Sequence, residues 1–164
     1  MRVERLGEHH AVDQFNSGNK VLDDWLRTHA LDNQRRNLSR TFVLVDDADT
    51  VLGYYSLTMG GVTAGELPKK LGRGLPRLTI GMVLLGRLAI AETRQGEGLG
   101  RDLIVDALLR AADAGERVAA RFVAVDPIDQ QAVDFYTKFG FTAIPGDSGG
   151  RMYVRLDHII EALA

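Results

Sequence analysis

The run Gln95–Gly100 has the composition of a phosphate-binding loop. Its three glycines, Gly96, Gly98 and Gly100, stand at alternate positions directly before a predicted helix. Because glycines carry no side chain, the first N–H groups of that helix can point at an anion, and the positive end of the helix dipole favours one there. The spacing therefore predicts a pyrophosphate site, with a plain flexible loop as the alternative.

Two common phosphate-binding motifs do not fit this run. A nucleoside triphosphate loop has the pattern GxxxxGK[ST], but Arg101 and Asp102 stand where Lys and Ser or Thr would follow. A dinucleotide-binding fold needs GxGxxG early in a parallel βαβ unit, whereas the run here is GxGxG. A different kind of phosphate ligand is indicated.

The pattern Gln95-x-x-Gly98-x-Gly100 resembles the Q/R-x-x-G-x-G/A motif of the GCN5-related N-acetyltransferases (GNAT), in which this loop binds the pyrophosphate of acetyl-CoA. Leu85–Ile90 resembles the central strand of that family, which pairs with the pantetheine arm. Phe135–Phe141 resembles the F-Y-x-x-x-G-F signature that closes the CoA site. The resemblance implies acetyl-CoA as acetyl donor, no metal, and these cofactor-binding residues: Leu88, Ala89, Ile90, Gln95, Gly96, Gly98, Leu99, Gly100, Arg101 and Phe135.

Three further segments, Phe15–Leu26, Gly53–Leu57 and Leu85–Ala89, resemble the tRNA-acetylating toxin subgroup of GNAT enzymes. Its members acetylate the amino group of aminoacyl-tRNA and are held inactive by a ribbon-helix-helix antitoxin. The resemblance covers about residues 12–156. It implies an aminoacyl-tRNA substrate, blocked translation as the outcome and such an antitoxin as partner. Dimers are common in the subgroup, so a homodimer is an oligomeric state that the resemblance allows.

Acetyl transfer from a thioester to an amine needs a neutral amine, donors for the oxyanion and a proton for the leaving thiolate. A tyrosine phenol, with an ordinary pKa of about 10, can supply that proton at neutral pH. By resemblance Tyr136 is the general acid; the alternative is a packing tyrosine on an apolar helix face. Backbone N–H groups at Gly86–Ala89 are the expected oxyanion donors. No base is assigned, so water can take the amine proton, and four histidines are expected at the solvated surface: His9, His10, His29 and His158.

Two basic clusters predict contact with a nucleic-acid backbone. Leu67–Ala91 holds five basic residues and no acidic one, and Asn33–Val45 holds a second acid-free cluster. Segregated positive charge gives salt-dependent binding to phosphates, and solvated loops kept basic for solubility are the alternative. Arg87 lies on a strand predicted to be buried, so it needs a carboxylate, carbonyl or phosphate partner. The residues predicted to bind tRNA are Arg36, Arg40, Lys69, Lys70, Arg73, Arg77 and Arg87.

Apolar periodicity and turn residues predict the elements that carry these groups. In order they are a helix over 19–37 capped by Asn19, an antiparallel hairpin of Thr41–Val45 and Leu52–Met59, a loop or broken helix over 60–78, a strand over Met82–Ile90 buried on both faces, helices over 98–114 and 129–139, and strands over Arg121–Val125 and Met152–Leu156. Gly86 indicates a bulge or a close backbone approach, Gly115 and Gly140 are expected to end helices, and Gly146–Gly150 forms a turn. The order predicts one α/β domain of GNAT type over residues 1–164, with a mixed central sheet flanked by helices.

Length and composition limit the classes of protein to which this chain can belong. The 164 residues suit one domain, and the 45% of hydrophobic residues suit a folded core. The absence of cysteine excludes disulfides, zinc ribbons and thiol nucleophiles, and the net charge of −2 argues against a basic nucleic-acid coat. The longest mostly apolar stretch, Leu78–Gly86, falls far short of the ~20 residues of a membrane span. With charges near the N-terminus that oppose a signal peptide, a soluble cytoplasmic protein is expected.

Two other functions stay open from the sequence. A GNAT enzyme that acetylates a small-molecule amine or a protein N-terminus would not need Arg36, Arg73 and Arg77. A non-catalytic, acyl-CoA-binding regulatory protein would not need Tyr136. An intact glycine loop together with the tyrosine argues against the second of these.

Overall fold

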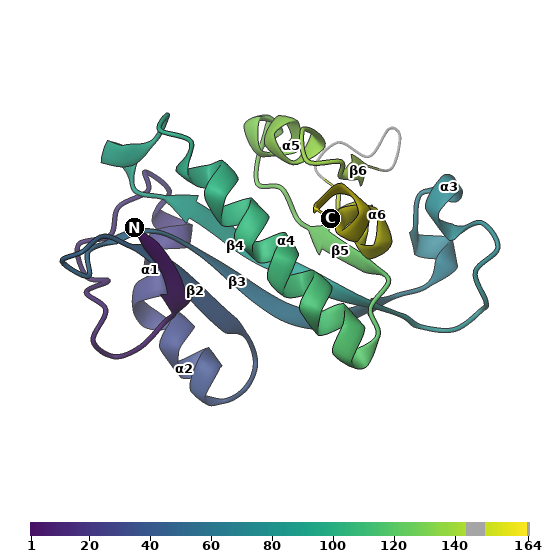
Figure 1. Ribbon diagram of the computed structural model, residues 1–164, viewed down its shortest axis with the longest axis horizontal. Helices are drawn as coiled ribbons and strands as arrows, with labels where there is room; N and C mark the ends of the chain where they lie inside the picture. Colours follow the sequence, from purple (N-terminus) through teal and green to yellow (C-terminus); the bar gives the residue numbers. More distant parts are fainter. Residues whose placement is uncertain (144–149, 164) are drawn as a thin grey trace. The chain divides into compact units, whose positions relative to one another are not determined.

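The strands follow the order β1-β2-β3-β4-β5-β7-β6 in a mixed, seven-stranded sheet, which confirms the predicted α/β fold class. The computed structural model describes residues 1–143 and 150–163 (Figure 1). Two compact units are present, Met1–Thr58 with Gly86–Ala107 and Met59–Leu85 with Leu108–Ala164. The elements are β1 (Arg2–Arg5), α1 (Lys20–Thr28), α2 (Ala30–Arg35), β2 (Arg40–Val45), β3 (Val51–Val62), η1 (Ala64–Glu66), α3 (Lys69–Gly72), β4 (Ile80–Ile90), η2 (Glu92–Arg94), α4 (Leu99–Val118), β5 (Phe122–Val125), α5 (Gln130–Thr137), β6 (Thr142–Ala143), β7 (Met152–Arg155) and α6 (Leu156–Leu163).

In the first unit, β2 and β3 form the predicted antiparallel hairpin. Its turn is held by Asp46, whose Oδ1 accepts hydrogen bonds from the N–H groups of Ala48 at 2.9 Å and Thr50 at 3.0 Å. Strand β1, which the sequence pattern did not reveal, pairs antiparallel with β2. Three of its four residues are charged, so the apolar alternation by which strands are recognised is missing.

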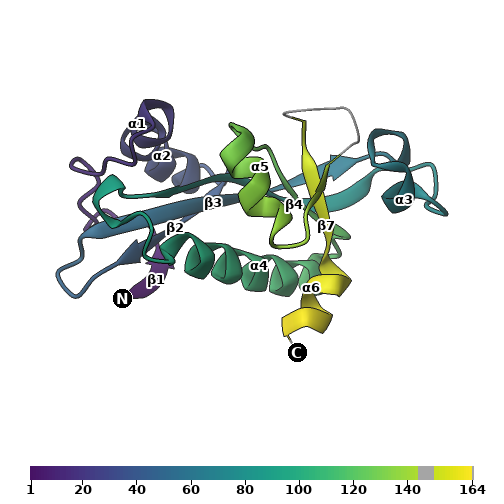
Figure 2. The ribbon, with the colours of Figure 1, turned by 90° about the horizontal axis from the view of Figure 1, so that it is seen from above.

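Successive residues of β3 face opposite sides of the first unit. The Tyr54 hydroxyl donates to the carbonyl of Leu22 in α1 at 2.7 Å, whereas the Tyr55 hydroxyl bonds to Asp106 in α4. Figure 2 shows α1 and α2 on one side of β2 and β3, and the start of α4 on the other. This is the period-two alternation of a strand covered on both faces. The core on the α1 side consists of Leu6, Phe15, Leu22, Trp25, Leu26, Ala30, Val43, Val45, Val51, Tyr54 and Ala89.

The single helix predicted over 19–37 was wrong in one respect, because two helices occupy that segment. His29 leaves helical geometry (φ −122°, ψ −29°) and separates α1 from α2. Asn19 caps α1 as predicted, since its side chain accepts from the N–H of Leu22 at 3.2 Å. The apolar residues that helical spacing places on one face are buried: Leu22, Trp25, Leu26 and Ala30. Asp23, which lies off that face, is nevertheless only 4% exposed.

In the second unit, β4 and β5 run parallel, while β7 pairs antiparallel with both β5 and β6. The segment 60–78 holds the end of β3 together with the short helices η1 and α3, so of the two predicted alternatives the broken helix is the one observed. Strand β6 was missed because it has two residues, and the end of the last predicted strand begins α6 instead. Residues 146–149 of the predicted turn lie outside the described residues. The core consists of Val62, Leu67, Ile80, Met82, Phe122, Ala124 and Tyr153.

Helix α4 does not end at Gly115, as the sequence had predicted. Gly115 lies inside the helix, and a Cβ there would stand 2.6 Å from Cδ1 of Leu156, so this glycine permits close packing against α6. The helix ends one turn later, before Ala119, whose φ of +73° is left-handed. Gly140, with φ +89°, closes α5 as predicted. Within the part of the chain that is described, no helix has the length and apolar character needed to cross a membrane.

Gly53 provides a test of the packing of β3. A Cβ on this buried residue would approach Cδ1 of Ile90 to 2.8 Å, and both the Ala89 carbonyl oxygen and Cδ1 of Leu103 to 2.9 Å. Gly53→Ala is therefore expected to lower the free energy of unfolding by about 1–3 kcal/mol, the usual cost of overpacking. Gly65→Ala is the control, since nothing lies within 4 Å of its added Cβ. Urea denaturation that gave both variants the same stability would contradict this account.

Candidate active site

The glycine loop, Gln95–Gly100, connects η2 to α4 in the first unit. Gly96 and Gly98 have φ of +85° and +83°, a conformation that other residues adopt only with strain. A Cβ added at either glycine would meet no atom within 4 Å, so open space lies beside the backbone. The N–H of Asp102 bonds to the Gly98 carbonyl at 3.3 Å, and the three N–H groups between these residues have no acceptor within the helix. Free donors next to open space fit a pyrophosphate.

The side chain of Gln95 turns toward the protein. Its Nε2 donates to the carbonyl of Ser17 at 2.9 Å and to that of Ile90 at 3.0 Å. Because both partners are carbonyl oxygens, the atom between them must be the amide nitrogen. The carboxamide therefore ties the entrance of the loop to two other segments of the first unit.

The end of β4 leads into the loop and is less buried than predicted. Ala89 is buried, whereas Leu88 and Ile90 are half-buried, so this part of the strand is not covered on both faces. Gly86 shows the predicted close approach, since an added Cβ would stand 3.3 Å from Oγ of Ser56. Backbone and side-chain atoms of 88–90 thus keep some access to solvent.

Tyr136 lies on α5 in the second unit and is 7% exposed. Its ring centroid is 5.3 Å from that of Phe135 and 5.5 Å from that of Phe141. Burial raises the pKa of the Tyr136 phenol above its ordinary value, because an apolar environment disfavours phenolate. The hydroxyl therefore keeps its proton throughout the neutral range and can only donate it to a strong base such as a thiolate.

The residues that lead into α5 have structural roles. Asp129, at the start of the helix predicted over 129–139, caps it by accepting from the N–H of Ala132 at 2.8 Å. Asp126 forms a two-point ion pair with Arg151, at 2.8 and 3.0 Å. The carboxylates that follow β5 are therefore already engaged within the second unit.

Arg87 has a partner that the sequence analysis did not consider. Its guanidinium lies 4.2 Å from the centroid of the Trp25 ring, a cation–π contact. The Trp25 ring is itself stacked near Tyr54, with centroids 6.1 Å apart and planes 12° apart. The half-buried cation is thus accommodated by an aromatic face, a kind of partner that the sequence pattern did not predict.

The other basic residues divide between the two units. In the first, Arg36 forms an exposed ion pair with Asp32 at 3.7 Å, and Arg40 donates to Oδ1 of Asn37 at 2.6 Å. An exposed ion pair contributes little to stability, so Arg36 stays available to phosphates. Arg40 is half-buried and also donates to the carbonyls of Gln34 at 3.2 Å and Ser39 at 3.5 Å. In the second unit, four predicted tRNA-binding residues lie exposed on and after α3: Lys69, Lys70, Arg73 and Arg77.

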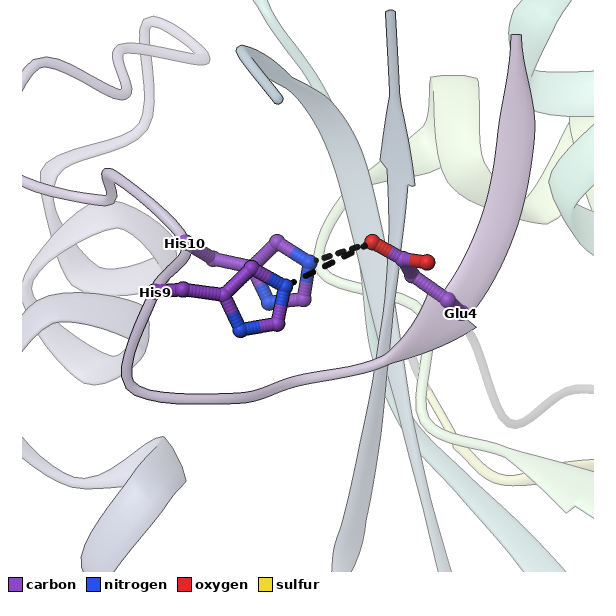
Figure 3. A group of neighbouring side chains, drawn as sticks. All are labelled: Glu4, His9 and His10. Carbon is purple, nitrogen blue, oxygen red and sulfur yellow. Dashed lines mark hydrogen bonds and ion pairs between the residues drawn. The ribbon is translucent and has the colours of Figure 1, made fainter. Parts of the chain in front are cut away.

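His10 is buried, which contradicts its predicted place at the solvated surface; its side chain is fully covered. Nδ1 accepts the N–H of Gly7 at 2.8 Å and Nε2 lies 2.7 Å from Glu4, with His9 3.8 Å from the same carboxylate (Figure 3). The three side chains have the donor types of a metal site. However, Nδ1 is an acceptor, so Nε2 of the neutral ring carries the hydrogen and has no lone pair for a metal. The arrangement fits a hydrogen-bonded cluster.

Residues 37–143 match the family model described as acetyltransferase (GNAT) domain. The chain belongs to the GNAT acetyltransferase family. It is 36% identical over 143 residues to the tRNA-acetylating toxin of Mycobacterium tuberculosis strain H37Rv, over 87% of this chain and 85% of that protein.

Two solved structures resemble the chain in fold. The structure of AtaT complexed with acetyl-methionyl-tRNAfMet has a TM-score of 0.89 and 26% identity, covering 99% of each chain. The crystal structure of AtaTR bound with AcCoA has a TM-score of 0.87 and 27% identity, covering 99% of this chain and 98% of the other. The GNAT fold of the chain is therefore matched along its whole length.

The first prediction for this GNAT site concerns Gly98. Gly98→Val is expected to raise the Kd for acetyl-CoA at least about 100-fold, because its side chain would fill the open space and strain the left-handed backbone. Gly74→Val is the matched control, since Gly74 also has positive φ (+79°) and open space around it. Isothermal titration calorimetry measures both. An unchanged Kd for Gly98→Val would show that the loop does not bind the pyrophosphate.

The second prediction concerns Tyr136. Tyr136→Phe is expected to keep the Kd for acetyl-CoA and to lower kcat at least ~10²-fold, the low end for general acid catalysis. Because burial raises the pKa of the phenol, its acid form persists as pH rises, and wild-type kcat is expected not to fall between pH 7 and the ordinary tyrosine pKa of about 10. A kcat that declined below pH 9, or a Tyr136→Phe variant with wild-type turnover, would remove this tyrosine from the mechanism.

Proposed function

We propose that this GNAT enzyme is a toxin that transfers the acetyl group of acetyl-CoA to the α-amino group of aminoacyl-tRNA and so blocks translation. The observation that carries the proposal is the 36% identity over 87% of the chain to a tRNA-acetylating toxin. The glycine loop and Tyr136 both lie within residues 37–143, the range that matches the GNAT family model, and they are proposed to supply the binding and acid functions that the reaction needs.

The residues of the first unit fit the acetyl donor. N–H groups at the start of α4 bind the pyrophosphate, and the backbone of β4 before the loop pairs with the pantetheine arm. Glycine is required at two of these positions, because a Cβ would occupy the open space beside the loop. The proposed set is Leu88, Ala89, Ile90, Gly96, Gly98, Leu99, Gly100 and Arg101, together with Phe135 from the second unit. Gln95 belongs to the set only as the first residue of the loop, because its side chain is engaged with protein carbonyls.

The acetyl donor supplies a thioester, and transfer forms a C–N bond as the C–S bond breaks. Tyr136 gives its phenolic proton to the departing sulfur and regains one from solvent. Backbone N–H groups within Gly86–Ala89 stabilise the oxyanion. The α-amine of an aminoacyl ester loses its proton more readily than a lysine does, so water suffices as the base.

Positively charged side chains are proposed to hold the acceptor, aminoacyl-tRNA. Exposed cations neutralise tRNA phosphates and make the affinity fall steeply with salt. The proposed residues are Arg36, Arg40, Lys69, Lys70, Arg73, Arg77 and Arg87. Of these, Arg87 is half-buried against Trp25, so its contact with tRNA requires an edge of the guanidinium that the indole leaves uncovered.

The remaining parts of the proposal follow from the toxin assignment. A ribbon-helix-helix antitoxin is the expected inhibitory partner, and the cytoplasm, where charged tRNA is found, is the expected location. A homodimer is the assembly that the resemblance allows. A single domain over residues 1–164 also stays a prediction.

The deciding experiment is transfer of labelled acetyl from acetyl-CoA to total charged tRNA, with deacylated tRNA as control. Label is expected only on charged tRNA.

Reversing two charges, as Lys69→Glu with Lys70→Glu, is expected to raise the KM for tRNA at least about tenfold at physiological salt, because two phosphate contacts are lost. Arg117→Glu, outside both basic clusters, should not change that KM.

Either of two results would overturn the proposal. No label on charged tRNA, in a preparation that binds acetyl-CoA, would direct the search to small amines and protein N-termini. Equal labelling of deacylated tRNA would show that the acceptor is not the aminoacyl group.

A further inference from the structure

A chain of hydrogen bonds links the start of α1 to the glycine loop within the first unit. The carboxylate of Asp23, 4% exposed, accepts the N–H of Ser17 at 3.0 and 3.1 Å and its Oγ at 2.6 Å. The carbonyl of Ser17 accepts Nε2 of Gln95 at 2.9 Å. Since Gln95 is the first residue of the loop, a buried carboxylate reaches the loop through one intervening residue.

A second contact runs beside the first. The N–H of Glu92 donates to the carbonyl of Asn16 at 2.7 Å, so adjacent residues of the segment 16–17 hold both Glu92 and Gln95. Gly18 follows with φ of +86°, and the Glu92 carboxylate lies 3.5 Å from where its Cβ would be. The entrance of the glycine loop is therefore fixed on two backbone carbonyls that belong to the turn before α1.

The bonding of Gln95 leaves its side chain unsuited to hold a phosphate. A carboxamide has two N–H hydrogens, and here both are directed to carbonyls, those of Ser17 and Ile90. Its remaining polar atom, Oε1, is an acceptor that would repel phosphate oxygens. Contact between this side chain and an anion would require the loss of a hydrogen bond that holds the loop.

We propose that Asp23, Ser17 and Gln95 form a positioning network that fixes the glycine loop, and that the side chain of Gln95 does not itself contact the pyrophosphate. The inference rests on the proposed function, because the loop is taken to bind acetyl-CoA. The network acts before binding: a loop already held in the binding conformation loses less entropy when the ligand arrives. Asp23 and Ser17 are positioning residues that the sequence analysis did not identify.

The first test compares two glutamines of the same unit. Gln95→Met removes both donors and is expected to raise the KM and Kd for acetyl-CoA about tenfold, the effect of losing two ordinary hydrogen bonds, while kcat at saturation stays within about twofold. Gln95→Arg keeps N–H donors and is expected to restore affinity. Gln34→Met is the control: Gln34 also bridges backbone groups, those of Leu6 at 2.7 Å and Thr41 at 3.1 Å. It should lower the melting temperature and leave the Kd unchanged.

The second test separates positioning from direct contact. Asp23→Asn disturbs the far end of the network and should weaken acetyl-CoA binding as Gln95→Met does, with the double variant no weaker than the worse single one, because residues that act through one another are not additive. Ser17→Ala, which loses only the Oγ bond, is the milder variant should Asp23→Asn fold poorly. Additive losses, or wild-type Kd values for Asp23→Asn and Ser17→Ala, would overturn the network.

Hydrogen exchange gives a readout that needs no ligand. The hydrogen-bonded amides that flank the loop, those of Glu92, Arg94 and Asp102, are expected to exchange at least about tenfold faster in Gln95→Met than in wild type or Gln34→Met, because local opening becomes easier. Equal exchange in all three would overturn the positioning role. If wild type failed to bind acetyl-CoA, the proposed function would fall, while this comparison would still decide whether the network holds the loop.

Discussion

Strand β3 packs against α1 on one face and against α4 on the other within the first unit, and this constraint determines which side chains its residues can have. Tyr54 and Tyr55 extend to opposite sides and each ends in a hydrogen bond to a different helix. Gly53 has no room for a side chain because the residues before the glycine loop and those of α4 both close on it. The positions of α1, the end of β4 and the start of α4 in this unit are thus set by three consecutive residues.

What the sequence could predict was local. The glycine spacing, the caps at Asn19 and Asp129 and the hairpin turn at Asp46 depend on neighbours a few residues away, so their patterns are legible in the chain itself. Contacts between residues distant in sequence could not be predicted in this way. Asp23, for example, has the pattern of an exposed helical acid, and its burial is explained only by its hydrogen bonds to Ser17 in the folded turn. Gly115 has the pattern of a residue that ends a helix, but a glycine is needed there because Leu156 packs too close for a side chain.

The same division applies to the two kinds of group that acetyl transfer requires. Donors for an anion come from backbone at a helix start, which glycine and helix signals reveal. The proposed proton donor, Tyr136, is kept neutral by burial, which no single residue type specifies. Sequence spacing therefore identified the tyrosine through its family motif, while the physical cause of its protonation required the packing of Phe135 and Phe141 around it.

The charges that concealed β1 have a further consequence. This strand stands at one end of the strand order, where unpaired backbone groups could recruit a strand from another molecule. Its sequence Arg-Val-Glu-Arg places charges along that border, and Arg2 binds both Glu4, at 3.1 Å, and Asp49. A second chain that paired with β1 would have to bury or displace these charged side chains, so the charged edge strand disfavours edge-to-edge aggregation of the sheet.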